Sequence, residues 1–408
     1  MPSSPSQTDV DADDVARARP AAETLARRTP MLSTRTISER AGGTVVLKAE
    51  NLQRTGSFKV RGVAAKLAAL GEAGGVVAAS AGNHGQALAA AARQRGWRCE
   101  VFMPTDAPLA KIEAARGQGA TIHIGGDSVD ECLGLALARA DEAGLAFVHP
   151  FDDPAVVAGQ GSLGLELLED TPDLAKVIVP VGGGGLCSGV AIAIKSARPE
   201  VEVVGVQAAA CAPYPESLAR GEAVPATSAL TIADGIAVKS PGELTLGLLK
   251  RWTDDVVVVG EDETAEAMVV LMERCKLVVE GAGAVGVAAL LGGQVHAAET
   301  GTTIAVLSGG NVDPGLLASV ARRHETEAGR RLVMLTRLPD RPGNLAKLLD
   351  CVASQGANIV DVSHVREGLD LHVRETAVEL VIETRGHDHA EEVVGTLRGA
   401  GYETRVIH

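Results

Sequence analysis

The sequence predicts an α/β protein in which helices cover open parallel sheets, followed by a smaller βαββαβ unit of ferredoxin-like topology. Short apolar runs alternate with Ala-rich stretches of helical spacing over residues 44–307. The composition is 46% hydrophobic but only 2% aromatic, so the cores must consist of Ala, Val, Leu and Ile. After the charged stretch 322–330, strand and helix patterns follow in the order βαββαβ.

Seven apolar runs in the first part predict strands, at residues 44–48, 75–79, 100–103, 121–124, 177–181, 201–206 and 303–307. The segments between them carry Ala and Leu at helical spacing. Because strands alternate with helices, we expect parallel sheets with helices on both faces. In the second part we expect strands at 331–338, 358–365, 375–384 and 403–407, and helices at 344–354 and 389–399.

A chain of 408 residues is long enough for two or three folding units. We expect a disordered lead over residues 1–20, a catalytic domain over 21–325 and a C-terminal domain over 330–408. Residues 1–20 contain no apolar run of the kind that a secretory signal needs, so we expect a cytoplasmic protein.

Charge and cysteine usage exclude several classes of partner. The net charge of −14 and the lack of a basic cluster argue against nucleic acid. Residues 177–194 are uncharged, but Pro180 and four glycines would break a membrane helix. The six cysteines show no CxxC spacing, which favours buried thiols in a reducing compartment over zinc or disulfides.

A lysine at the start of a predicted helix is the first candidate for catalysis. Ser57 is expected as the N-cap of a helix that runs to Leu70, with Gly71 as its stop. Lys59 would then lie in the first turn, where the helix dipole disfavours a cation and lowers its pKa, as a Schiff-base lysine requires. Taken alone, the pattern favours an exposed lysine whose amino group bends into solvent.

The loop after the strand at 75–79 is a candidate anion site. Its residues are Ser80, Ala81, Gly82, Asn83 and His84. Because a helix follows, free backbone N–H groups are expected to bind a carboxylate or phosphate there. The histidine fits a capping or core-packed residue at least as well as a catalytic one.

Two further loops follow predicted strands. Gly182, Gly183, Gly184 and Gly185 come directly after the strand at 177–181. Consecutive glycine amides can surround one anion, and the spacing matches neither a dinucleotide nor a Walker motif, so a single phosphate is expected. The turn 308–311 ends the strand at 303–307, at the sheet edge where ligands of open α/β sheets gather.

In their order along the chain, these motifs resemble those of the fold-type II pyridoxal-phosphate enzymes, and more closely the threonine dehydratases (threonine ammonia-lyases) with one regulatory domain. The resemblance covers about residues 25–408 and depends on TGSFKVRG, SAGNHGQAL, the four glycines, ADGIAV and SGGNVD. It implies two parallel-sheet lobes, the smaller at about 55–155, and pyridoxal phosphate as cofactor. It also implies β-elimination of L-threonine to 2-oxobutanoate and ammonia, and of L-serine to pyruvate.

The resemblance implies roles for individual residues. Lys59 would form the Schiff base with the cofactor and act as the general base. The cofactor-binding residues would be Phe58, Lys59, Asn83, Gly182, Gly183, Gly184, Gly185, Leu186, Gly235, Glu280, Ser308 and Gly309. Asn83 would hydrogen-bond the 3-oxygen of the cofactor, and Ser308 would face its pyridine nitrogen. The substrate carboxylate would bind at Ser80, Ala81, Gly82, Asn83 and His84.

Other functions stay open. Within the family these are serine racemase, serine dehydratase and hydroxyaspartate-type dehydratase. Racemases of this family have a serine as second acid and base where this chain has Ala81, so we expect elimination without racemisation. Residues 207–213 lack the carboxylates with which some relatives hold a divalent cation, so no metal is expected. A nicotinamide oxidoreductase would need a dinucleotide fingerprint, and a non-enzymatic amino-acid sensor would leave Lys59 unexplained.

The C-terminal unit resembles an ACT domain. The turn after its first strand matches the effector loop of that family and contains Asp340, Arg341, Pro342, Gly343, Asn344 and Leu345. The resemblance implies isoleucine or valine as an effector and a homo-oligomer, at least a dimer. A purely structural oligomerisation domain is the alternative.

Overall fold

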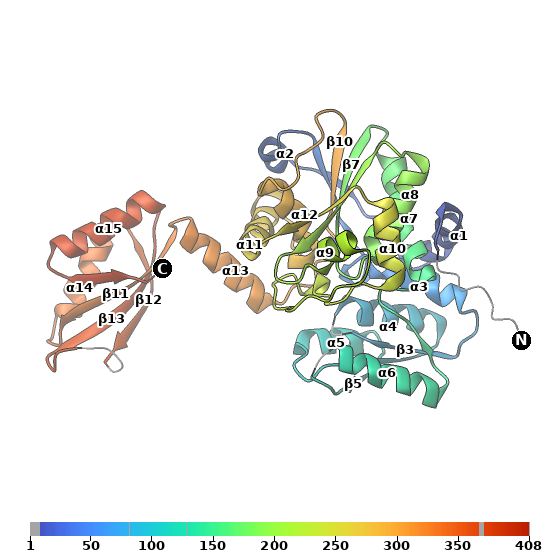
Figure 1. Cartoon of the computed structure of the whole chain (residues 1–408). Coiled ribbons are helices and arrows are strands. Elements are labelled where there is room, and N and C mark those ends of the chain that lie inside the picture. Colours follow the sequence, from blue (N-terminus) through green and yellow to red (C-terminus); the bar gives the residue numbers. More distant parts are fainter. Residues whose placement is uncertain (1–8, 81, 128, 367–370, 408) are drawn as a thin grey trace, which may run out of the picture. The chain divides into compact units, whose positions relative to one another are not determined.

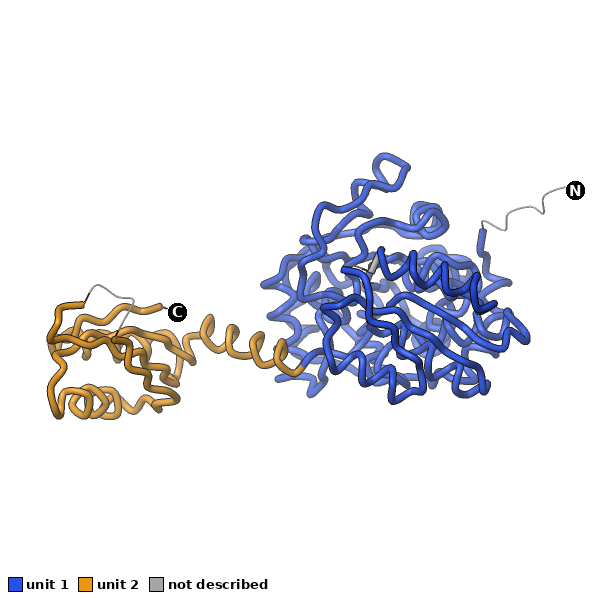
Figure 2. The backbone as a smooth tube through the Cα atoms, turned by 90° about the horizontal axis from the view of Figure 1, so that it is seen from below, with its two compact units in different colours: residues 1–313 blue, residues 314–408 orange. Residues whose placement is uncertain are grey.

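The structure, a computed structural model, describes residues 9–80, 82–127, 129–366 and 371–407. The chain divides into two compact units, residues 1–313 and 314–408 (Figure 2). Among the described residues, unit 1 contains two sheets and unit 2 contains one, and each unit has its own hydrophobic core. In the described part of the chain, no helix is long and apolar enough to cross a membrane.

The larger sheet of unit 1 has six strands in the order β1-β2-β10-β7-β8-β9. All neighbours are parallel except β1, which is antiparallel to β2. The strands are β1 (Met31–Ser33), β2 (Val45–Lys48), β7 (Leu174–Pro180), β8 (Glu202–Ala208), β9 (Asp255–Val259) and β10 (Thr302–Val306). Helices α8 (Gly185–Ala197) and α12 (Gly281–Leu291) pack on opposite sides of this sheet, so its central strands are apolar on both faces (Figure 1).

The smaller sheet of unit 1 has four parallel strands in the order β5-β4-β3-β6. These are β3 (Gly75–Ala79), β4 (Arg98–Met103), β5 (Thr121–Ile124) and β6 (Ala146–Phe147), with helices α4 (Asn83–Arg95), α5 (Leu109–Gly117) and α6 (Val129–Ala143) between them. They form the second lobe of unit 1 (Figure 1). Alanines of α4 such as Ala87 and Ala91 are buried against this sheet, as the low aromatic content leads one to expect.

The remaining elements of unit 1 pack around the larger sheet or join the lobes. The helices are α1 (Ala12–Glu23), α2 (Arg35–Ala41), α3 (Lys59–Ala69), α7 (Pro154–Asp170), α8 (Gly185–Ala197), α9 (Pro213–Arg220), α10 (Glu243–Trp252), α11 (Glu261–Val270) and α12 (Gly281–Leu291). Short turns of helix are η1 (Glu50–Leu52), η2 (Arg54–Gly56), η3 (Asp234–Ile236) and η4 (Leu271–Cys275).

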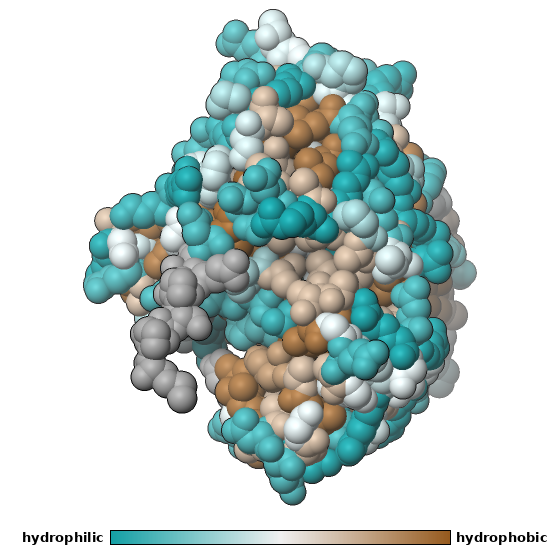
Figure 3. Space-filling view, turned by 90° about the vertical axis from the view of Figure 1, so that its right-hand side faces the viewer, coloured by the Kyte–Doolittle hydropathy of each residue, from teal (hydrophilic) through white to brown (hydrophobic). Residues whose placement is uncertain are grey.

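Seen from the right of Figure 1, hydrophobic residues gather in the middle of the surface between hydrophilic margins (Figure 3).

The α/β class with parallel sheets is confirmed. A strand occurs at each of the seven places where unit 1 was predicted to have one. The prediction omits β1, β6 and β9. β1 and β6 are only three and two residues long, too short to show a periodic pattern. β9 is an apolar run that is visible in the sequence, and the strand prediction overlooked it.

The disordered lead predicted for residues 1–20 is wrong for the described part of that segment, because α1 begins at Ala12. Asp11 accepts a hydrogen bond from the amide of Asp14, and the side chain of Asp14 accepts one from the amide of Asp11. This reciprocal cap starts the helix. Val10 and Val15 are buried in a cluster with residues of α7 and α8, which holds the helix on unit 1.

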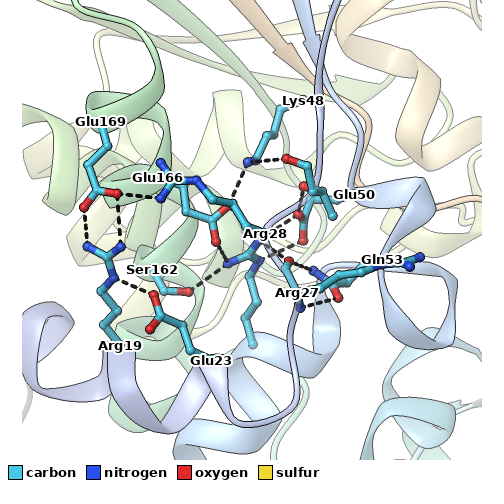
Figure 4. A network of polar contacts seen from close by, with 12 residues as sticks. Arg19, Glu23, Arg27, Arg28, Lys48, Glu50, Gln53, Ser162, Glu166 and Glu169 are labelled. Atoms are coloured by element: carbon cyan, nitrogen blue, oxygen red, sulfur yellow. Dashed lines mark hydrogen bonds and ion pairs between the residues drawn. The ribbon is translucent and has the colours of Figure 1, made fainter.

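A network of charged side chains is buried between β2, α3 and α7 (Figure 4). Lys48, Glu50, Arg61 and Glu166 are each at most 2% exposed. Arg61 donates to Glu50 at 2.8 Å and to Glu166 at 2.7 Å. Lys48 donates to Glu166 at 2.7 Å. The two positive charges balance the two negative charges, and these ion pairs fix the first turn of α3 against α7.

Unit 2 has a four-stranded antiparallel sheet in the order β12-β13-β11-β14. Its elements are α13 (Pro314–Glu327), β11 (Arg331–Pro339), α14 (Asn344–Ser354), β12 (Asn358–Val365), β13 (Glu375–Glu383), α15 (His387–Gly399) and β14 (Glu403–Val406). From β11 onward this is the predicted βαββαβ order. The division of the chain lies at residue 313 rather than near 325, because α13 contacts β11.

Candidate active site

Lys59 is the first residue of α3, and the segment before it is tied to the end of β10. The predicted N-cap, Ser57, is wrong by one residue, since Phe58 occupies that position. Ser57 is extended because it pairs with Gly309 in a β-bridge. The amide of Phe58 donates to the carbonyl of Ser308 at 3.1 Å. These bonds bring the predicted Schiff-base lysine to the predicted turn 308–311.

The amino group of Lys59 has no carboxylate partner among the described residues. Its Nζ donates to the carbonyl of Pro150 at 2.9 Å and lies 5.2 Å from the ring centroid of Phe58. Burial lowers the pKa of Lys59 to about 8, and the charge of Glu280 opposes this shift only in part. The low pKa was predicted, but its main cause is burial rather than the helix dipole.

The four glycines form the turn from β7 into α8. Gly184 has a φ of 86°, a left-handed conformation that favours glycine. A Cβ on Gly183 would lie 2.1 Å from the ring of Phe151. In the described part of the chain, the amides of residues 182–185 donate to no acceptor. They are therefore available to an anion, and the start of α8 adds its positive dipole end.

Residues 149–152 connect Lys59 to the turn formed by residues 182–185, hereafter the glycine loop. The sequence-based site omits this segment. Pro150 accepts the hydrogen bond from Lys59, while the ring of Phe151 packs on Gly183. The segment follows β6 and precedes α7, which Asp153 caps. Its place at the carboxyl end of a parallel strand is the signal that could have found it, but a two-residue strand gives no pattern.

Asn83 and Glu280 meet beside the turn 308–311. Asn83 Nδ2 donates to Glu280 Oε1 at 2.7 Å, and Asn83 Oδ1 accepts from Asn311 Nδ2 at 2.7 Å. Burial, and next the charge of Asp234, raise the pKa of Glu280 to about 7. A Cβ on Gly309 would lie 2.1 Å from Glu280 Oε1. Asn311 thus holds the side chain of Asn83; the sequence analysis includes Asn311 in the turn 308–311 but assigns it no role of its own.

The loop before α4 has backbone N–H groups that could bind an anion, although two of them already donate to the side chain of Ser80. Ser80 Oγ accepts hydrogen bonds from the amides of Gly82 at 3.2 Å and Gly85 at 3.1 Å. Within the described residues, the amides of Asn83 and His84 donate to no acceptor. A carboxylate at this helix N-terminus would therefore find two free N–H groups.

His84 is buried and uncharged. Its Nε2 is 2.9 Å from the carbonyl of Val148, so this nitrogen carries the proton and donates. Burial, and then the charge of Lys59, lower the pKa of His84 to about 3. Ala81, on which the expected lack of racemisation depends, lies outside the described residues.

The other predicted cofactor residues surround the same region. Ser308 is 3% exposed, and its hydroxyl donates to the carbonyl of Ala282 at 3.4 Å. A Cβ on Gly235 would lie 3.4 Å from Glu280 Oε1. Leu186, the second residue of α8, is buried in the core of the larger lobe.

These residues fit pyridoxal phosphate. The cofactor needs an amine for its aldehyde, donors for its phosphate and polar groups around its ring. Lys59 supplies an amine of lowered pKa, and the glycine loop supplies free amides. Because Pro150 and Phe151 are consecutive, the lysine and the loop lie on either side of one dipeptide.

The predicted effector loop lies between β11 and α14 in unit 2. Asp340 forms an ion pair with Arg366, and Asn344 Nδ2 donates to the carbonyl of Pro339 at 2.9 Å. Gly343 has a φ of 88°. A cavity of about 510 Å³ in the same unit lies elsewhere, among residues of α13, β11 and α15 that include Arg331.

Comparison with known proteins shows the family. The profile of the family described as "Pyridoxal-phosphate dependent enzyme" matches residues 22–309. The chain is 44% identical to the L-threonine ammonia-lyase of Thermotoga maritima, over 97% of this chain and 99% of the relative. It is 43% identical to the protein of the same name from Geobacter sulfurreducens, over 97% and 98%.

Solved structures agree in fold. A maize serine racemase is 33% identical with a TM-score of 0.73, over 78% of this chain and 98% of that one. A threonine deaminase from tomato, Solanum lycopersicum, is 30% identical with a TM-score of 0.70, over 78% and 98%. From the lysine, the glycine loop and these similarities together, the chain belongs to the family of pyridoxal-phosphate-dependent enzymes.

Proposed function

We propose that this enzyme is an L-threonine ammonia-lyase, which eliminates water from L-threonine and regains one water in the hydrolysis that releases ammonia, giving 2-oxobutanoate, and which converts L-serine to pyruvate in the same way. The observation that carries the proposal is the similarity, along almost the whole chain, to two proteins of that name. The site supports it, since a half-buried lysine of lowered pKa lies near a glycine loop whose amides are free among the described residues.

Each group of the site has a task in this reaction. Pyridoxal phosphate held at this site would supply the electron sink for the substrate carbon that loses its proton. The free amides of Asn83 and His84 bind the substrate carboxylate. Lys59 Nζ, with a pKa of about 8, accepts the Cα proton as general base. The amides of residues 182–185 hold the cofactor phosphate, and neutral His84 adds no charge beside the lysine.

Formation of 2-oxo acids tests the proposal. The purified enzyme is supplied with L-threonine, L-serine or L-aspartate, and 2-oxo acid and ammonia are measured in parallel. We expect equal amounts of both from threonine, a slower reaction with serine and none with aspartate. Lack of product from threonine with the cofactor bound would refute the proposal. A second candidate, serine racemase, is favoured by the likeness to the maize structure and would produce D-serine.

We further propose that unit 2 is an ACT-type regulatory domain that binds isoleucine or valine in a homo-oligomer. The βαββαβ order supports this, as does the start of α14, where the amides of Leu345 and Ala346 have no acceptor among the described residues and suit a carboxylate. We expect the effector to shift the dependence of rate on threonine by a coupling of about 1–3 kcal/mol.

Two variants of the full chain test where the effector binds. Asn344→Ala removes the hydrogen bond to the Pro339 carbonyl, while Arg331→Ala alters the separate cavity. Calorimetric titration with isoleucine should lose its signal in Asn344→Ala and keep it in Arg331→Ala. The opposite pattern would place the effector in the cavity, and no binding to the wild type would leave only a structural role for unit 2.

A further inference from the structure

Tyr214, in α9, contacts the glycine loop at Gly183 and Gly184. The side chain is fully buried, and its hydroxyl donates to the carbonyl of Gly183 at 2.9 Å. A Cβ on Gly184 would lie only 2.6 Å from this hydroxyl. Phe151 packs on Gly183 as well. Two aromatic side chains therefore hold the loop in place.

The Tyr214 hydroxyl is itself held by a second residue. It lies 3.0 Å from Thr245 Oγ1, and Asp152 Oδ1 accepts from the amide of Thr245 at 3.0 Å and from its hydroxyl at 3.2 Å. A carbonyl only accepts, so the single Tyr214 proton goes to Gly183. Thr245 must then donate toward the Tyr214 oxygen, sharing its proton with Asp152.

The direction of these bonds sets the direction of an amide in the loop. A peptide bond is planar and trans, so the N–H of Gly184 points opposite to the carbonyl of Gly183. When Tyr214 holds that carbonyl, the Gly184 N–H is turned to the other side of the loop. Within the described residues this N–H has no acceptor, and it is thus presented to an anion.

We propose that Tyr214 is a positioning residue for the cofactor phosphate, fixing the glycine loop through the Gly183 carbonyl, and that Thr245 and Asp152 orient its hydroxyl. The inference rests on the proposed assignment of residues 182–185 as the phosphate site, and it does not depend on the substrate. Tyr214 touches neither cofactor nor substrate in this role.

Cofactor binding with and without the phosphate tests the inference. Cofactor-free full-length protein is titrated with pyridoxal phosphate and, separately, with pyridoxal, which has the aldehyde but no phosphate, and absorbance gives both dissociation constants. Tyr214→Phe should lower the preference for pyridoxal phosphate over pyridoxal by about three- to tenfold, as expected for one hydrogen bond. The ³¹P resonance of the bound phosphate should also shift.

Matched variants keep the test decisive. Tyr402→Phe, which alters the other tyrosine of the chain, should behave as wild type. Thr245→Val should repeat the Tyr214→Phe effect, and Thr245→Ser, which retains a hydroxyl, should restore the preference. These two variants decide the matter if Tyr214→Phe does not fold.

Three results would overturn the inference. An unchanged preference in both Tyr214→Phe and Thr245→Val would do so. Equal weakening of both ligands would also do so, because it indicates a general structural role. If the wild type shows no preference for pyridoxal phosphate over pyridoxal, the phosphate-site assignment itself is wrong. None of these measurements uses threonine, so failure of the proposed reaction is a separate result.

Discussion

The buried charge network predicts that two glutamates on the same helix have very different effects on stability. Glu166 and Glu169 lie three residues apart on α7, and each forms ion pairs with two cations. The side chain of Glu166 is 3% exposed and that of Glu169 is 44% exposed. Replacing each by Gln removes one charge with almost no change of shape.

The expected magnitude for Glu166→Gln follows from its partners. Without this carboxylate, Glu50 alone balances Lys48 and Arg61, and one buried positive charge is left over. Breaking a buried pair in this way costs about 3–5 kcal/mol. Asp170, which is 3.8 Å from Lys48 and 27% exposed, offsets part of the loss. We therefore expect a loss of about 3 kcal/mol in the free energy of unfolding.

Glu169→Gln is the matched control. Its arginine partners are 27% and 46% exposed, so water screens both ion pairs. We expect a loss of about 0–1 kcal/mol.

Urea unfolding followed by tryptophan fluorescence measures both losses. The two tryptophans, Trp97 and Trp252, both belong to unit 1, so the signal follows that unit. With an unchanged slope, the shift in midpoint gives the change in free energy. In salt of about 1 M, where the screening length is about 3 Å, the Glu169 effect should vanish and the Glu166 effect should persist.

Similar small losses for the two variants would refute this reasoning, because they would mean that water reaches the network around Arg61. A Glu166→Gln effect that disappears in high salt would lead to the same conclusion.

Three further predictions concern the site. Lys59→Ala should fold but lose turnover, and borohydride reduction of the wild type should label Lys59; label on another lysine would contradict the assignment. Because burial lowers the pKa of Lys59 to about 8, the neutral fraction rises with pH, and cofactor attachment measured by stopped-flow absorbance should speed up and level off above that pH; an inflection near 10.5 would mean an exposed amine. With L-serine, chiral chromatography should detect no D-serine, since residue 81 is Ala; its formation would reveal another proton donor.

Local patterns predicted most of the fold. Apolar runs such as 121–124 and glycine turns such as 182–185 carry their structure in a few consecutive residues, and both occur where expected. The helix at Ala12 was missed because the segment is polar in composition. Two aspartates form the cap of this helix, and two buried valines pack it against unit 1. Polarity averaged over the whole segment conceals such specific contacts.

The candidate site was predictable only in part, because its contacts join distant segments. Asn311 and Asn83 are 228 residues apart, and Tyr214 and Gly183 are 31 apart. No spacing rule links them. Residues next to a glycine or lysine motif could be found from the sequence, whereas residues that orient those motifs through other side chains, such as Thr245, are identified only in the folded structure.

The start of α3 shows how burial yields opposite chemistry in two neighbouring cations. Burial acts to lower the pKa of both Lys59 and Arg61. Arg61 faces two carboxylates at 2.8 and 2.7 Å, and their charges raise its pKa above the usual value. Among the described residues, Lys59 Nζ contacts a carbonyl and an aromatic ring but no carboxylate, and burial lowers its pKa to about 8 although the charge of Glu280 opposes the shift. Arg61 can therefore stay charged and anchor the helix, while Lys59, on the same turn, can release a proton at a pH near 8 and react as an amine.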